Sequence, residues 1–108
     1  MKLIQRVLLV SLLSPGIAFG AQVFGSVMVG DSPAALRTVV ITCGTNRYDG
    51  QTDQRGSYSI NVSVTGKCSF SVEGYNSSSV TLYSYPKPTR YDFALSRKAD
   101  GSYDLVRR

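Results

Sequence analysis

The sequence predicts an all-β domain, a sandwich or barrel of about seven or eight short strands. Apolar residues alternate with polar ones along most of the chain, which is the period of a half-buried strand and not of a helix. Turn-forming residues recur about every ten positions, as in sandwiches and barrels. The chain has 108 residues, of which 43% are hydrophobic, and this suffices for one globular domain.

The first twenty residues differ from this pattern. Lys2 and Arg6 precede the apolar run Val7–Leu13, and Ala18 and Gly20 are small residues at the positions that a signal peptidase reads. The run is shorter than the about 20 residues that span a bilayer. We therefore expect a signal peptide over residues 1–20 and a mature, secreted or periplasmic domain over residues 21–108 without a transmembrane anchor. An uncleaved membrane anchor is the alternative.

Three strands are expected in the first part of the mature chain. The first covers residues 23–29 and ends at the turn 30–33, and the second covers residues 39–43. Residues 47–52 suit a short edge strand, because Tyr48 is the only large apolar side chain in this segment. The side chains expected on one face of the first two strands are those of Val23, Gly25, Val27, Val29, Val39, Ile41 and Cys43.

The next segment, Asp53-Gln54-Arg55-Gly56, is a turn signal. Aspartate suits the first turn position, where its carboxylate accepts backbone N–H groups ahead of it, and glycine suits the fourth. Tyr58, Ile60 and Val62 then line one face of a strand. We expect a tight turn at 53–56 that leads directly into this strand.

The last part of the chain repeats the pattern. Strands are expected over residues 68–72, 80–83, 91–95 and 103–105. Between them lie the loop 74–78, the segment Pro86-Lys87-Pro88 and the hairpin turn Ala99-Asp100-Gly101. Proline lacks the N–H that a central strand must donate, so the proline segment interrupts the sheet.

Two cysteines, Cys43 and Cys68, are expected to form a disulfide. An even number of cysteines in an exported chain favours a structural bridge, and both are in phase with the apolar residues of their strands. Such a bridge either crosses the core or joins neighbouring strands. A redox pair or two free thiols are the alternatives, although the chain has no Cys-x-x-Cys spacing.

Several motifs occur in the order of a known family. Gly25-Ser26-Val27 is followed by Thr52-Asp53-Gln54-Arg55-Gly56-Ser57-Tyr58-Ser59-Ile60 and then by a strand that ends in Gly74-Tyr75. Over residues 23 to about 85 the chain resembles the carboxypeptidase regulatory-like domain, a transthyretin-like (prealbumin-like) β-sandwich. The resemblance implies a prealbumin-like, Ig-like sandwich of seven to eight strands that serves as an accessory module without catalytic residues.

The composition argues against an enzyme. The chain contains no histidine, which removes the commonest general base and the commonest metal ligand. Asp49 and Asp53 form only a thin carboxylate cluster, and aspartate in a turn satisfies its own backbone. We expect no catalytic residues, no metal and no cofactor. Nucleic acid is not expected as a partner, because the chain is exported and its basic residues are scattered.

Tyrosines are the remaining candidates for binding. Tyr83, Tyr85 and Tyr91 bracket the proline segment, with Lys87 and Arg90 beside them. Aromatic side chains with a basic neighbour suit sugars or partner peptides, whereas tyrosines also simply cover half-buried strands.

The sequence thus leads to an exported, non-catalytic module that recognises a protein or a cell-envelope polymer. The mature chain has ten basic and seven acidic residues, a net charge of +3. Such a mild charge suits anionic glycans or a membrane surface, but it is also typical of an ordinary solvated surface. The alternatives are a small carbohydrate-binding module that uses the exposed tyrosines, and a peptidase-associated factor or inhibitor that acts on a separate chain.

Overall fold

The computed structural model describes residues 21–108, and the expected signal peptide lies outside the described residues. All regular secondary structure in this range is β, which confirms the predicted fold class. Eight strands have five or more residues and two have only two. Their bounds are β2 Ala21–Val29, β3 Ser32–Pro33, β4 Thr38–Cys43, β5 Asn46–Gln51, β6 Ser57–Val62, β7 Gly66–Val72, β8 Val80–Ser84, β9 Thr89–Arg90, β10 Phe93–Arg97 and β11 Tyr103–Arg107.

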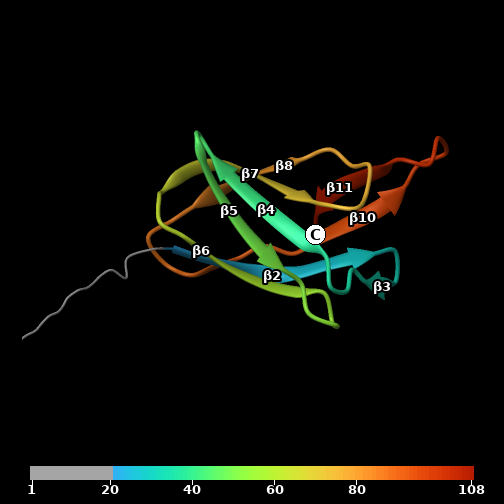
Figure 1. Ribbon diagram of the computed structural model, residues 1–108, viewed down its shortest axis with the longest axis horizontal. Helices are drawn as coiled ribbons and strands as arrows, with labels where there is room; N and C mark the ends of the chain where they lie inside the picture. Colours follow the sequence, from blue (N-terminus) through green and yellow to red (C-terminus); the bar gives the residue numbers. More distant parts are fainter. Residues whose placement is uncertain (1–20) are drawn as a thin grey trace, which may run out of the picture.

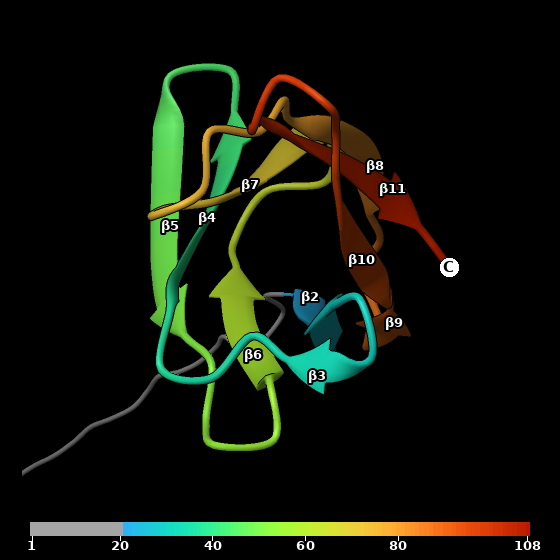
Figure 2. The ribbon, with the colours of Figure 1, turned by 90° about the vertical axis from the view of Figure 1, so that its right-hand side faces the viewer.

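The strands form two sheets that pack as a sandwich (Figure 1). One sheet has four strands in the order β5-β4-β7-β8, and the other has six strands arranged around β2. In Figure 2 the four-stranded sheet lies along the left and top, and β6, β2 and β10 lie along the bottom and right. The expected edge strand at 47–52 is β5, which ends the four-stranded sheet.

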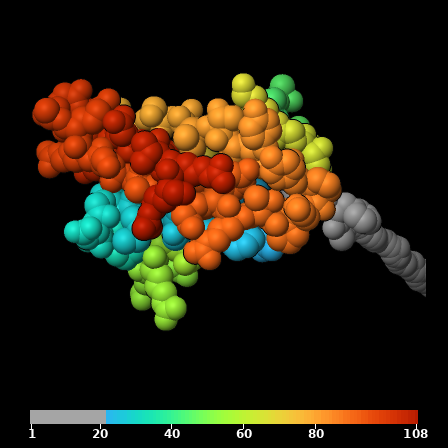
Figure 3. Space-filling model, turned by 180° about the vertical axis from the view of Figure 1, so that it is seen from behind, coloured from blue at the N-terminus to red at the C-terminus, as the bar shows by residue number. Residues whose placement is uncertain are grey.

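β2 organises the larger sheet because different neighbours pair with its two halves. Residues 21–26 pair antiparallel with β6, and Val23 and Phe24 also pair parallel with β9. Residues 27–29 pair parallel with β10, and Met28 and Val29 also pair with β3. The residues from β8 to β11, orange to red, make up most of the face seen from behind (Figure 3).

The core lies between the sheets and is centred on two stacked phenylalanines. Phe70 of β7 and Phe93 of β10 are both fully buried, and their ring centroids are 4.1 Å apart. Tyr58 of β6 packs on Phe70 at 5.2 Å. The predicted alternation is clear in β6, where Tyr58, Ile60 and Val62 are buried and the residues between them are exposed. These rings link strands from both sheets.

The disulfide between Cys43 and Cys68 is present, as the sequence predicted. It joins the neighbouring strands β4 and β7 of one sheet and does not cross the core. The two cysteines lie one position beyond the last ladder pair, Thr42 and Ser69, with their Cα atoms 4.3 Å apart. Both are buried, at 6% and 4% exposure. The bridge therefore fixes the register of the two central strands of this sheet.

The turn at 53–56 has the predicted chemistry. The Asp53 carboxylate accepts the N–H groups of Ser57 and Arg55 at 2.9 and 2.8 Å, and these bonds hold the pKa of Asp53 below its ordinary value. Gly56 has a φ of 80°, and a Cβ placed there would lie 2.5 Å from the carbonyl oxygen of Val27. The glycine therefore serves the turn and also lets it lie against β2.

A buried threonine fixes the loop before β4. Thr52 is 1% exposed, and its hydroxyl donates to the carbonyl of Ala34 and accepts the N–H of Arg37 at 2.8 Å. Between these two residues Leu36 adopts a φ of 56°, which is uncommon for a residue other than glycine. The Thr52 hydrogen bonds therefore hold a loop conformation that the local sequence does not favour.

Candidate binding site on the outer face of the six-stranded sheet

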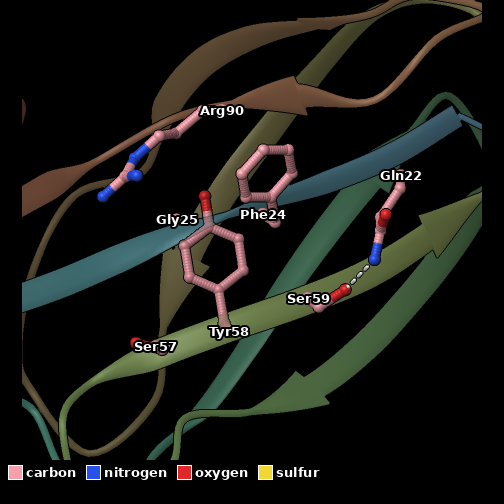
Figure 4. Close-up of a pocket in the computed structure, with 7 residues that line it drawn as sticks. All are labelled: Gln22, Phe24, Gly25, Ser57, Tyr58, Ser59 and Arg90. Atoms are coloured by element: carbon pink, nitrogen blue, oxygen red, sulfur yellow. Dashed lines mark hydrogen bonds between the residues drawn. The ribbon is translucent and has the colours of Figure 1, made fainter.

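An open pocket of about 360 Å³ lies on the six-stranded sheet where β2 passes between β6 and β9. In Figure 4 the ring of Phe24 lies between Arg90 on one side and the hydrogen-bonded pair of Ser59 and Gln22 on the other. Tyr58 borders the pocket as well, but its ring belongs to the core. The volume falls at the small end of the range for ligand sites. The lining residues are Gln22, Phe24, Gly25, Ser57, Tyr58, Ser59 and Arg90.

The strand register explains why these side chains meet. Phe24 lies opposite Ser59 of β6 and opposite Arg90 of β9. Residues in register on neighbouring strands share a face of the sheet. Since Val23 and Val27 point into the core, Phe24 points outward and is only half-buried. One row across three strands therefore places a hydroxyl, an aromatic ring and a guanidinium next to one another.

Arg90 is oriented by an aspartate two residues further along. Its Nε donates to both carboxylate oxygens of Asp92, at 3.2 and 3.0 Å. The Asp92 carboxylate also accepts the N–H and the hydroxyl of Ser26, at 2.9 and 3.1 Å. Burial raises the pKa of Asp92, but the hydrogen bonds from Arg90 and Ser26 outweigh it and hold this pKa below its ordinary value. The aspartate thus stays ionised and anchors the arginine to β2.

The lowered pKa of Asp92 predicts a pH dependence of stability. A carboxyl with a depressed folded-state pKa stabilises the protein above its unfolded pKa of about 3.9, and this contribution is lost as the pH falls through the folded value. We expect the free energy of unfolding to fall more steeply below about pH 4 in the wild-type protein than in Asp92→Asn. Urea denaturation at a series of pH values measures this. Identical slopes in the two proteins would contradict the assigned role of Asp92.

The predicted tyrosine surface is not one surface. Tyr83 and Tyr85 are 47% and 45% exposed and lie on or just after β8 in the other sheet, whereas Tyr91 is only 4% exposed. The expectation that Tyr91 presents its ring to a ligand is therefore corrected. Lys87 is exposed in the proline segment, and Arg90 belongs to the pocket.

Tyr91 is buried because its hydroxyl closes the edge of β8. This hydroxyl donates to the carbonyl of Tyr83 at 2.9 Å and accepts the N–H of Tyr83 at 3.2 Å. Among the described strands β8 pairs only with β7, so the phenol occupies the place of a further strand. Arg107 covers the ring, with its guanidinium carbon 4.6 Å from the centroid. Tyr91 is therefore a structural residue that connects β8 to the six-stranded sheet.

Removal of this hydroxyl will destabilise the sandwich. In Tyr91→Phe the backbone N–H and carbonyl of Tyr83 lose their partner, and we expect a loss of about 1–2 kcal/mol in the free energy of unfolding. Tyr85→Phe is the matched control, because Tyr85 is exposed. Equilibrium urea denaturation of both variants measures this. Equal stability of the two variants would contradict a stabilising connection between Tyr91 and β8.

Of the seven residues that line the pocket, sequence reasoning proposed only Arg90 for binding. It placed Gly25 and Tyr58 on inward faces and gave no role to Gln22, Phe24, Ser57 and Ser59. These four side chains occupy the outward phase of β2 and β6, and three of them are polar residues, which are ordinary on an exposed strand face. The available signal was Phe24, an aromatic residue out of phase with the inward valines of the same strand. An outward aromatic residue beside polar ones marks a candidate binding face.

The pocket chemistry suits binding. The hydrogen-bond partner of Ser59 is the amide of Gln22, at 2.5 Å, and an amide does not act as a general base. The phenol of Tyr58 donates to the carbonyl of Tyr91 at 2.6 Å, and burial raises its pKa, so it stays protonated. Residues 21–108 hold no group of three or more side chains suited to a metal ion.

No known family model matches this chain, and neither does any curated protein. Among the described residues no helix is long and apolar enough to cross a membrane. The pocket itself is therefore the main guide to function.

Proposed function

We propose that this protein is an exported, non-catalytic module that binds a component of the cell envelope through the pocket around Phe24 and Arg90. The observation that carries this proposal is the row of Ser59, Phe24 and Arg90 across three paired strands. It combines an apolar platform with fixed hydrogen-bonding groups, the usual make-up of a binding site. The site is built on paired strands, so it is in place before a ligand arrives.

Export is part of this proposal. The chain begins with the charge and hydropathy pattern of a signal peptide. The disulfide between Cys43 and Cys68 fits an oxidising compartment such as the periplasm or the extracellular space. Expression of the full chain, followed by N-terminal sequencing of the protein recovered from the periplasm or medium, should yield a chain that starts at Ala21. A protein that retains residues 1–20 in the membrane would contradict export.

We further propose that the domain is a carboxypeptidase regulatory-like domain. The two-sheet sandwich is compatible with that family. The Thr-Asp-x-x-Gly-x-Tyr-x-Ile stretch, its most specific motif, has a structural role at each of several positions: Thr52 fixes a loop, Asp53 and Gly56 make the turn, and Tyr58 and Ile60 enter the core. Domains of this family are accessory modules, which agrees with a binding role.

Capture from the native envelope tests the binding role. The exported protein is immobilised and incubated with solubilised envelope from the cell of origin, with Phe24→Ala/Arg90→Gln as the matched control. We expect at least one component that the wild-type protein retains and the double variant does not. If the two proteins retain the same components, the pocket is not the binding site and the proposal fails.

A further inference from the structure

Phe24 forms an apolar platform on an otherwise polar face. The outward residues around it on β2 and β6 are Gln22, Ser26, Ser57, Ser59 and Asn61. Phe24 is half-buried, so its ring is held in place by its neighbours while part of it stays accessible. One face of a pyranose ring carries mainly C–H groups, and such a face stacks on an aromatic ring of this kind.

Neutral hydrogen-bonding groups surround the platform. Ser57 and Ser59 supply hydroxyls, and Gln22 supplies an amide whose nitrogen already donates to Ser59. Hydroxyls and amides both donate and accept, and sugar hydroxyls require this combination. The pocket therefore offers a sugar an apolar face below and polar partners at its rim.

The Arg90 guanidinium adds a preference for negative charge. Asp92 accepts hydrogen bonds only from the Nε of Arg90. Within residues 21–108 no acceptor is hydrogen-bonded to the two terminal nitrogens of Arg90. A guanidinium held on one side presents its remaining N–H groups as a fork, which matches the two oxygens of a carboxylate. Arg90 lies in register with Phe24, and both side chains line the pocket (Figure 4).

A peptide fits this place less well. Peptides that bind to sheets usually pair with an open strand edge. At the pocket β2 is already paired on both sides, with β6 and with β9. Among the described strands β6 and β9 pair only with β2, so a peptide strand could add to their outer edges, but it would lie beyond Phe24. Recognition at Phe24 itself therefore depends on side chains, which suits a compact ring with a carboxylate better than an extended main chain.

From these contacts we propose that the pocket binds an acidic sugar residue of an envelope glycan, with its ring on Phe24 and its carboxylate on Arg90. The inference rests on the proposed function and names the class of ligand for the same site. The proposed glycan site is thus on the six-stranded sheet, and not at Tyr83, Tyr85 and Tyr91, where the sequence placed it.

The test is an NMR titration of the ¹⁵N-labelled exported protein with two probes, an oligogalacturonate and its carboxyl-reduced, neutral counterpart. We expect amide shifts at β2, at β6 around Ser57–Ser59, and at Arg90, and tighter binding of the acidic probe. Phe24→Ala should lower the affinity for both probes about tenfold or more, since it removes the aromatic ring on which the sugar stacks. Arg90→Gln should weaken the binding of the acidic probe alone, by about the same factor. Arg90→Lys keeps the charge but loses the paired N–H groups, so its affinity for the acidic probe should lie between those of the wild type and Arg90→Gln.

Tyr83→Ala, on the other sheet, is the control and should change neither affinity. Equal affinity for the two probes, or shifts confined to Tyr83 and Tyr85, would overturn the inference. Binding of an acidic peptide at Phe24 and Arg90 in place of the oligogalacturonate would also overturn it. If neither probe binds while capture from the envelope still depends on Phe24 and Arg90, the glycan assignment is wrong and the proposed function stands. If capture is lost as well, both are wrong.

Discussion

A Gly25→Ala variant is expected to lose at least about 3 kcal/mol of unfolding free energy, a large fraction of the stability of a small domain. A Cβ at this position would lie 1.9 Å from the carbonyl oxygen of Tyr91 and 2.7 Å from its carbonyl carbon. These are backbone atoms, so no side-chain rotation relieves the overlap. The same carbonyl accepts the buried hydroxyl of Tyr58 at 2.6 Å, so a shift of Tyr91 also breaks this hydrogen bond.

Gly30→Ala is the matched control for this prediction. Gly30 directly follows the same strand with a φ of 59°, and a Cβ there meets no atom within 4 Å. Its expected cost is about 1 kcal/mol, from the left-handed backbone alone. Circular dichroism and urea denaturation of the two variants give the comparison. A Gly25→Ala protein as stable as Gly30→Ala would show that β2 and the segment at Tyr91 are not in close contact.

The second large effect is expected from removal of the disulfide. Cys43 and Cys68 are 25 positions apart, and closing a loop of this length stabilises by about 3.5 kcal/mol in the chain-entropy model. We expect a Cys43→Ala/Cys68→Ala protein to lose a similar amount, a large part of the stability of a domain of this size. The bridge is between adjacent strands, so the folded register should persist in the variant.

Denaturation of the wild-type protein with and without reductant measures this effect independently of the substitution. The double variant should show no dependence on reductant, and the reduced wild type should approach its stability. Intact mass spectrometry of the unreduced protein should show a mass lower by two hydrogens than that of the reduced protein. A wild-type curve that does not move on full reduction would contradict a stabilising bridge.

Strand positions were predictable because alternation and turn chemistry are local. The turn at 53–56 illustrates this, since Asp53 and Gly56 satisfy requirements set within four residues. The predicted disulfide followed from composition and phase, but its path did not, because strand phase does not reveal which strands are neighbours. The structure shows that β4 and β7 are adjacent, so the bridge stays within one sheet.

The candidate site was largely beyond sequence reasoning for the same reason. Phe24 and Arg90 are 66 positions apart and meet only because β9 adds to β2 in parallel. For Tyr91, the alternation with Phe93 and Leu95 indicates an inward side chain, whereas its place beside the proline segment and Arg90 favours a binding surface. The structure confirms the inward phase, since Tyr91 is 4% exposed. Its burial depends on the edge of β8, which its hydroxyl closes. Local alternation gives the phase of each side chain, but long-range pairing decides which side chains meet at the pocket and at the edge of β8.

The proposed functional surface is therefore the outer face of β2, β6 and β9, in place of the predicted surface at Tyr83, Tyr85 and Tyr91. Tyr83 and Tyr85 remain exposed on their own sheet, and Arg90 is the one predicted binding residue that lies in the pocket. The two surfaces belong to different sheets, so substitutions separate them cleanly.

Envelope capture by two double variants side by side tests this claim most directly. One variant is Phe24→Ala/Arg90→Gln, and the other is Tyr83→Ala/Tyr85→Ala, with denaturation curves to confirm that both fold. The first variant is expected to lose the component that the wild-type protein retains, and the second is expected to retain it. Loss in the tyrosine variant with retention in the Phe24 and Arg90 variant would contradict the account.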